Sequence, residues 1–172
     1  RQMTTDRNIA SITADLADEV QEVAKRYPSK RSAIMPALYL AQDKYGNVDD
    51  VVYQAISEML DVPKIWVFEV ASFYSMYNRE ELGKYHIQFC TNVSCMLLGA
   101  DDVLENMQKR LGIKAGETTD DRLFTLSRVE CIGACDVAPV MIVNEKYYNN
   151  LTDERVAEIL DQLEKDVMEA AG

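Results

Sequence analysis

The stretch Cys90-Thr-Asn-Val-Ser-Cys95, together with Cys131-Ile-Gly-Ala-Cys135, holds all four cysteines of the 172-residue chain. One pair has four residues between its cysteines, and the other has three. Four thiolates in two short loops can hold an iron–sulfur cluster or a zinc ion if the loops meet in space. The segments around these loops therefore decide both the fold and the kind of site to expect.

Each cysteine loop follows a segment with the alternating pattern of a strand. Residues 84–89 alternate apolar and polar side chains up to Cys90, and residues 124–130 do the same up to Cys131. Between them, apolar residues at helical spacing end at Gly112, namely Met96, Leu97, Val103, Leu104, Met107 and Leu111. Strand, helix and strand predict a parallel crossover. Both cysteine pairs are then expected at the carboxyl edge of one sheet.

Hydrogen-bond donors in these loops suit an anionic cluster, whose sulfurs need such partners. Loops 91–95 and 132–135 can supply backbone N–H groups. Gly133 can adopt a positive φ angle, which lets its loop curl around a metal. The hydroxyls of Thr91 and Ser94 can either donate to the cluster or cap the local backbone.

The spacing of the cysteines alone does not decide which kind of site they form. Zinc loops typically separate their ligands by ~2–4 residues, so a zinc site fits as well as a cluster. Two disulfides also fit the count of four cysteines. A thioredoxin-like dithiol is disfavoured because no C-x-x-C occurs. A chain whose cysteines all belong to one such motif suits a reducing compartment.

Segments near the cysteines narrow this choice. They are VASFYSMYN at 70–78, GKYHIQFC at 83–90, LGIKAGETT at 111–119, VECIGAC at 129–135 and AP at 138–139. With the C-x4-C and C-x3-C spacing, they closely resemble one family, the small thioredoxin-like 2Fe–2S subunit of NADH:quinone oxidoreductase, respiratory complex I. The resemblance runs from about Tyr27 to Leu163.

The resemblance implies an α+β protein with an N-terminal helical bundle over residues 1–80 and a thioredoxin-like 2Fe–2S ferredoxin domain over residues 84–172. It implies one 2Fe–2S cluster and no catalytic residue in this chain. The implied ligands, for cofactor and metal alike, are Cys90, Cys95, Cys131 and Cys135.

The implied function is electron transfer as a subunit of an NADH dehydrogenase. The cluster would exchange single electrons with the FMN of a partner subunit that binds NADH, and further subunits of the peripheral arm would be neighbours. The expected location is the cytoplasmic side of a bacterial inner membrane, or the matrix side in mitochondria.

Two alternatives accompany this interpretation. The same module occurs in NAD-linked hydrogenases and formate dehydrogenases, so the motif identifies the module more closely than the host enzyme. The alternative of another class is a structural protein stapled by zinc. Colour and metal content separate that protein from an iron–sulfur protein.

The N-terminal part shows four helical patterns. The first covers 6–26 with Asp6 as a candidate cap, and the second covers 32–45 and stops at Gly46. Asp49 or Asp50 is expected to cap the third. The fourth is expected from Pro63 to about Tyr77. Its aromatic residues exceed one stripe, so some are expected to face a partner: Trp66, Phe68, Phe73, Tyr74 and Tyr77.

The C-terminal part predicts a short strand at 140–143, a turn at Asn144-Glu145 and a strand at 146–148. Thr152 is expected to cap a last helix. The residues alone thus give a mixed sheet flanked by helices. Pro139 is a candidate for a cis peptide bond, although most bonds that precede proline are trans.

Composition excludes other classes of function. The net charge of −11 argues against a nucleic-acid surface and against binding to anionic lipid. No apolar run approaches the ~18 residues of a membrane span. No glycine-rich nucleotide motif follows a strand. His86, the one histidine, is interpreted as a sheet residue rather than a ligand, and Met96 is expected to shield the cluster from water.

Overall fold

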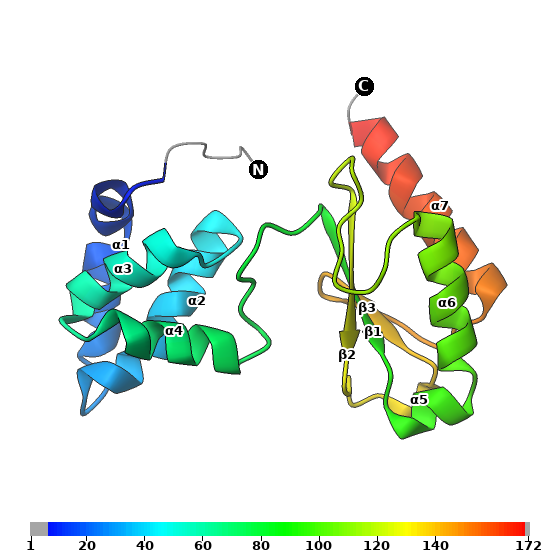
Figure 1. Cartoon of the computed structure of the whole chain (residues 1–172), viewed down its shortest axis with the longest axis horizontal. Coiled ribbons are helices and arrows are strands. Elements are labelled where there is room, and N and C mark those ends of the chain that lie inside the picture. The colour runs from blue at the N-terminus through cyan, green and yellow to red at the C-terminus, as the bar shows by residue number, and fades with distance from the viewer. Residues whose placement is uncertain (1–6, 171–172) are drawn as a thin grey trace. The chain divides into compact units, whose positions relative to one another are not determined.

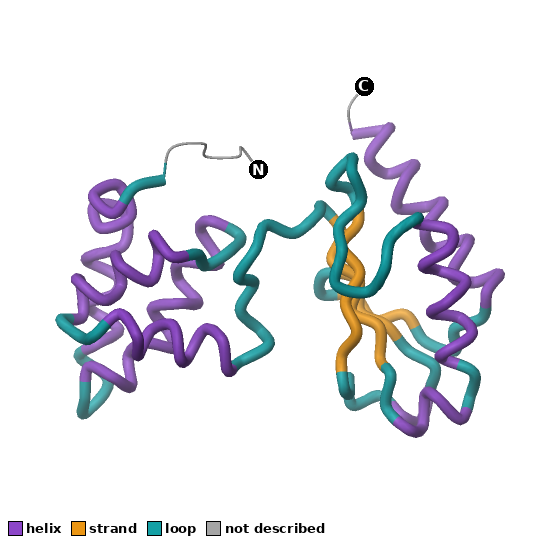
Figure 2. The backbone as a smooth tube through the Cα atoms, viewed as in Figure 1, coloured by secondary structure: helices purple, strands orange, loops and turns teal. Residues whose placement is uncertain are grey.

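The computed structural model of the chain describes residues 7–170 (Figure 1). The chain divides into two compact units, Arg1–Glu81 and Leu82–Gly172. The described part of the first unit is helical, and the second unit combines a four-stranded sheet with helices (Figure 2). This is the predicted α+β class. The assignment of 1–80 and 84–172 as separate domains stays a prediction.

The first unit is a small bundle of helices joined by short connections. Its elements are α1 (Ile9–Ala24), the 3-10 turn η1 (Lys30–Ala33), α2 (Ile34–Tyr45), α3 (Asp50–Leu60) and α4 (Lys64–Phe73). The apolar stripes of these helices meet in one core, which includes Ile12, Leu16, Val20, Ile34, Leu38, Ile56, Leu60 and Val67. Burial of these stripes holds the bundle together, as in other helical bundles.

The first helix begins later than the sequence suggested. Asp6 lies outside the described residues, and the observed cap of α1 is Asn8. The N–H of Ser11 donates to Oδ1 of Asn8 at 2.9 Å, and the N–H of Asn8 donates to Oγ of Ser11 at 3.1 Å. This reciprocal capping box satisfies two backbone donors that the first turn would otherwise leave without a partner.

The fourth helix is shorter than predicted. It ends at Phe73, because Tyr74 already has an extended backbone with ψ of 118°. Tyr77 then turns back into the core of the bundle, where its hydroxyl donates to the carbonyl oxygen of Met35 at 2.9 Å. The prediction of a helix to Tyr77 was therefore wrong, since hydrophobic burial of Tyr77 is achieved from a loop.

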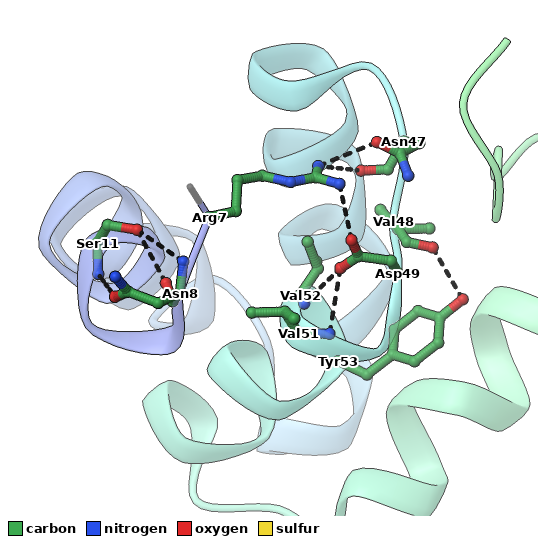
Figure 3. A network of polar contacts seen from close by, with 9 residues as sticks. All are labelled: Arg7, Asn8, Ser11, Asn47, Val48, Asp49, Val51, Val52 and Tyr53. Carbon is green, nitrogen blue, oxygen red and sulfur yellow. Dashed lines mark hydrogen bonds and ion pairs between the residues drawn. The ribbon is translucent and has the colours of Figure 1, made fainter. Parts of the chain in front are cut away.

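Asp49 caps α3, as expected, and also joins the segment before α1 to this helix (Figure 3). Its Oδ1 accepts hydrogen bonds from the N–H groups of Val51 and Val52, at 3.1 and 3.0 Å. Its Oδ2 pairs with the guanidinium of Arg7 at 2.7 Å. Arg7 also donates to Oδ1 of Asn47 at 3.0 Å. One carboxylate thus satisfies the first turn of α3 and fixes the residue that leads into α1.

The second unit is built on a mixed sheet whose strands occur in the order β2-β1-β3-β4. The strands are β1 (Tyr85–Cys90), β2 (Phe124–Val129), β3 (Met141–Val143) and β4 (Lys146–Tyr148). β1 and β2 are parallel, whereas β3 pairs with β1 and β4 in the antiparallel sense. The strands predicted from alternation are therefore confirmed.

The crossover between β1 and β2 contains two helices instead of the single predicted one. They are α5 (Val93–Leu97) and α6 (Ala100–Leu111), and Gly99 separates them with φ of 89°. Gly112 ends α6 in the left-handed conformation, as expected. Because of the break at Gly99, α5 and α6 do not form one continuous helix. Cys95 lies on α5.

Two helices cover one side of the sheet. Figure 1 shows α6 and α7 (Asp153–Ala170) on the same side of the strands. Their buried residues Leu104, Met107 and Leu160 belong to one core with Phe89 of β1 and Leu126 of β2. Thr152 caps α7 as predicted, because its Oγ1 accepts from the N–H of Arg155 at 3.2 Å. No helix within residues 7–170 is long and apolar enough to cross a membrane.

Gly83 lies where the connecting chain meets the sheet. A Cβ at this position would lie 2.9 Å from the carbonyl carbon of Phe124 and 3.0 Å from the carbonyl oxygen of Arg122. Its N–H donates to Oγ1 of Thr125 at 2.6 Å, and that hydroxyl also lies 2.8 Å from Oγ1 of Thr118. Close backbone approach therefore requires glycine at this residue.

We expect Asp49→Ala to destabilise the bundle by about 0.5–3 kcal/mol, because it removes an N-cap worth about 0.5–2 kcal/mol and an ion pair worth up to about 1 kcal/mol. The control Asp49→Asn keeps an oxygen for the N–H groups of α3 and should cost less than about 1 kcal/mol. Urea unfolding followed by circular dichroism measures both changes. Equal losses in the two variants would contradict the capping role.

Candidate metal centre

The parallel pairing of β1 and β2 brings the two cysteine loops to one edge of the sheet. Cys90 is the last residue of β1 and lies opposite Val129, the last residue of β2. Cys131 follows Val129 after one intervening residue. Cys95 lies on α5, and Cys135 begins the 3-10 turn η2 (Cys135–Val137). The predicted meeting of both pairs at the carboxyl edge is confirmed at the level of the backbone.

The two cysteine pairs differ in burial. Cys90 and Cys95 are only 2% and 1% exposed, whereas Cys131 and Cys135 are exposed to solvent. All four are free thiols in the structure. The buried pair belongs to the core beneath the sheet edge, and the exposed pair forms the outer side of the site.

Cys95 interacts with Cys90 and Cys135. Burial raises the pKa of its thiol to about 11, and a hydrogen bond with Cys90 adds to this rise. A hydrogen bond from the backbone of Val140 acts in the opposite direction, and the nearby Cys135 raises the pKa further. A buried thiol among other thiols holds its proton until a positive charge, such as that of a metal, compensates the thiolate.

The exposed loop has the donor geometry that the sequence suggested. The N–H of Gly133 donates to Sγ of Cys131 at 3.3 Å, and Gly133 has φ of 80°. The hydroxyl of Thr91 instead donates to the carbonyl oxygen of Val129 at 3.3 Å, so it serves the local backbone. Of the two roles that the sequence left open for the loop hydroxyls, Thr91 therefore has the backbone-capping one, and the role of Ser94 stays a prediction.

The thiols at this edge of the sheet are the kind of ligand that a two-iron cluster requires. Among residues 7–170, no group of three or more His, Cys, Asp or Glu side chains is placed to hold one metal ion. A structural zinc site requires four ligands that meet at one ion. A 2Fe–2S cluster is held by four thiolates over two irons, and Cys90, Cys95, Cys131 and Cys135 supply that number of thiols.

His86 is a sheet residue, as the sequence indicated. It lies within β1, and its Nε2 is 2.8 Å from Oγ of Ser127 on the neighbouring strand. Burial lowers the pKa of its imidazole, so the neutral form is favoured at pH 7. In the described part of the chain, its side chain bonds to this serine and to no cysteine. The shielding role expected for Met96 stays a prediction.

Sequence reasoning missed Val140. The N–H of Cys90 donates to its carbonyl oxygen at 3.2 Å, and its own backbone bonds to Cys95. Both contacts use backbone atoms, so no side-chain signal could have identified them. The peptide bond between Ala138 and Pro139 is cis, which resolves the question that the sequence left open for Pro139.

Comparison with known proteins agrees with this geometry. Residues 20–164 match the family described as thioredoxin-like 2Fe-2S ferredoxin. An NADH-quinone oxidoreductase subunit of Rhizobium meliloti (strain 1021) is 45% identical over 146 residues, which cover 85% of this chain and 87% of that protein. An NADH-quinone oxidoreductase subunit of Rickettsia conorii is 46% identical over 149 residues, with 85% and 89% covered.

A solved structure shares the fold. The crystal structure of an NAD+-reducing NiFe hydrogenase in the air-oxidised state matches with a TM-score of 0.68 at 20% identity. The match covers 78% of this chain but 23% of the hydrogenase chain, so the likeness concerns the fold of one part of that protein. Together, the family match and the two bacterial relatives show that this chain belongs to the thioredoxin-like 2Fe-2S ferredoxin family, among the members that are subunits of NADH-quinone oxidoreductase.

Proposed function

We propose that the chain is an electron-transfer subunit of an NADH:quinone oxidoreductase. It holds one 2Fe–2S cluster through Cys90, Cys95, Cys131 and Cys135, and it exchanges single electrons with the FMN of a partner subunit that binds NADH. The observation that carries the proposal is the parallel pairing of β1 with β2, since it ends both cysteine loops at one edge of the sheet.

The cluster would supply one-electron chemistry, and the chain supplies the environment. The buried Cys90 and Cys95 face the apolar core, which limits access of water to their sulfurs. N–H donors such as Gly133 offset negative charge on sulfur, and such hydrogen bonds help to set the reduction potential. We assign no acid–base catalytic role to any residue of this chain.

The bacterial relatives support a quinone-reducing host. They are 45–46% identical over 85% of the chain, whereas the NAD+-reducing hydrogenase is related by fold at 20% identity. The quinone oxidoreductase is therefore favoured over a hydrogenase or a formate dehydrogenase. The family match favours a cluster over a structural zinc ion.

Exposed apolar side chains on the first unit support a docking surface for the flavoprotein partner. On α4 and just after it, the exposed members are Ile65, Phe68, Phe73, Tyr74 and Met76. Phe73 is 80% exposed. Of the other aromatics singled out in the sequence, Tyr77 is buried and Trp66 packs against the guanidinium of Arg31 at 4.6 Å. Exposed aromatics in this number are typical of interface centres.

We place the subunit on the cytoplasmic side of a bacterial inner membrane, as a peripheral part of its complex. Bacterial relatives such as those of Rhizobium and Rickettsia support this choice over the mitochondrial matrix. Further subunits of the peripheral arm are expected beside the flavoprotein.

The cofactor is tested by the composition of the purified chain. Prepared without oxygen, it should be reddish-brown and contain about two irons and two acid-labile sulfides per chain, the content of one 2Fe–2S cluster. Reduction with dithionite should produce an electron paramagnetic resonance signal of one unpaired electron. A colourless protein with stoichiometric zinc would contradict the proposal.

The ligand assignment is tested by two variants. We expect Cys131→Ala to lose the cluster, because one iron then lacks a thiolate. His86→Ala should keep the cluster and lose about 1 kcal/mol of stability with its hydrogen bond to Ser127. Visible absorption and iron content measure both outcomes. Bleaching by the histidine variant, with an intact spectrum in the cysteine variant, would overturn the assignment.

The docking surface is tested with the full chain and its flavoprotein partner. Phe73→Ser should raise the dissociation constant at least tenfold, equivalent to about 1.4 kcal/mol, while the spectrum of the cluster stays unchanged. Met168→Ser is the matched control, because Met168 is 75% exposed on α7, in the other unit. Equal effects of the two substitutions would contradict a docking role for the exposed residues of α4.

A further inference from the structure

We propose that Cys131 and Cys135 are the entry site through which the chain receives its cluster. Their thiolates bind the incoming cluster first, and Cys90 and Cys95 complete the ligand set afterwards. The inference rests on the proposed function, since it requires that the chain carry a 2Fe–2S cluster. It adds an order of ligation and assigns different roles to two pairs of ligands that look equivalent in the sequence.

The two pairs of cysteines differ in their exposure to solvent. An incoming cluster is held by the thiolates of its donor, and a ligand can be exchanged only if the new sulfur reaches the iron. Cys131 and Cys135 are exposed, whereas Cys90 and Cys95 are 2% and 1% exposed. The outer pair can therefore contact a cluster that still belongs to another molecule. The inner pair can do so only after the cluster has moved into the site.

The backbone of the inner pair, Cys90 and Cys95, is held by regular secondary structure. Cys90 is held in β1 by its own N–H bond to Val140, at 3.2 Å. Cys95 lies in α5, where the N–H of Leu98 bonds to its carbonyl oxygen at 3.1 Å. The backbone that carries the inner sulfurs is thus held by a strand and a helix.

The outer loop lacks regular secondary structure, although its Ile132 and Ala134 pack against the core. Residues 130–134 belong to no helix or strand. Gly133 contributes an N–H bond to Sγ of Cys131, and the N–H of Val137 bonds to the carbonyl oxygen of Ala134 at 3.3 Å. Gly133, at φ of 80°, would have no atom within 4 Å of an added Cβ, so open space surrounds this turn. A donor can therefore reach the exposed thiols of this loop without displacing a strand or a helix.

The transfer is an exchange of ligands without oxidation or reduction. At each iron, a bond to a donor sulfur breaks and a bond to a cysteine sulfur of this chain forms. The proton of each incoming thiol passes to the departing donor thiolate, so charge and electrons balance. The donor class is a thiolate-ligated 2Fe–2S cluster with exchangeable ligands, and a 2Fe–2S cluster ligated by glutathione is the probe for it.

Two double variants test the order. The full-length chain, free of cluster, is mixed with the glutathione-ligated probe, and uptake is followed by visible circular dichroism. Cys90→Ser with Cys95→Ser keeps the outer pair and should take up the cluster at a rate within about threefold of the unchanged chain. Native mass spectrometry should then detect the chain with the cluster and two glutathiones. Cys131→Ser with Cys135→Ser should be at least tenfold slower.

Equal rates in the two double variants, or faster uptake by the one that keeps the inner pair, would overturn the proposal. Far-UV circular dichroism of both variants before mixing checks that each retains the fold. If neither takes up cluster, a pair of glycine variants that keep all four cysteines decides the question.

The glycine variants place similar backbone strain beside each pair. Gly133→Ala strains the outer loop, and Gly99→Ala strains the turn after the helix that carries Cys95. Both glycines have a positive φ, 80° and 89°, and neither has an atom within 4 Å of an added Cβ. Uptake should slow several-fold in Gly133→Ala and stay unchanged in Gly99→Ala. Equal slowing, or slowing by Gly99→Ala alone, would contradict entry through the outer pair.

Failure of the inference and failure of the proposed function have different signatures. If the unchanged chain takes up no cluster from the probe or from iron and sulfide, the proposed function fails. If the unchanged chain takes up a full cluster but the variants that keep the outer pair intact do not take it up faster, the proposed function stands and the proposed order of ligation is wrong.

Discussion

The parallel pairing of β1 with β2 is the constraint on which the rest of the second unit depends. A parallel pair requires a crossover, and here α5 and α6 provide it and bury one side of the sheet. The same pairing sets Cys90 opposite Val129, so the loop that follows each strand starts from the same edge. A slip of either strand by one residue would turn its core side chains, such as Phe89 of β1 or Leu126 of β2, away from the core and shift the cysteine loop that follows it, so core and site are specified together.

The sequence predicted the elements more reliably than their ends. Alternation in 84–89 and 124–130 predicted β1 and β2, because each strand buries one face. The cap of α3 at Asp49 and the stop at Gly112 were also predictable, since each depends on one side chain or on the lack of one. Asn8 was missed as a cap because Asp6 is equally suitable by type. What separates them is the reciprocal bond with Ser11, which is a matter of geometry.

The four cysteines of the candidate site could be proposed from the sequence, whereas their surroundings in the fold could not. The identity of the four cysteines follows from spacing and from resemblance. The difference between a buried and an exposed pair depends on how α5 and the loop after β2 pack, and no pattern in the sequence encodes it. Similarly, Val140 acts through its backbone, so any residue at that position with an N–H could make the same contacts. Sequence patterns record side chains, whereas much of this site is made by the main chain.

The lack of room at Gly83 limits where homologous chains can differ in the length of the connection between the two units. The backbone of Phe124 and Arg122 leaves no space for a side chain there, and the N–H of Gly83 is already bonded to Thr125. Insertions and deletions are tolerated where backbone is exposed and unbonded. Homologous chains should therefore differ in length before residue 83, and the connection should regain a common register at this glycine.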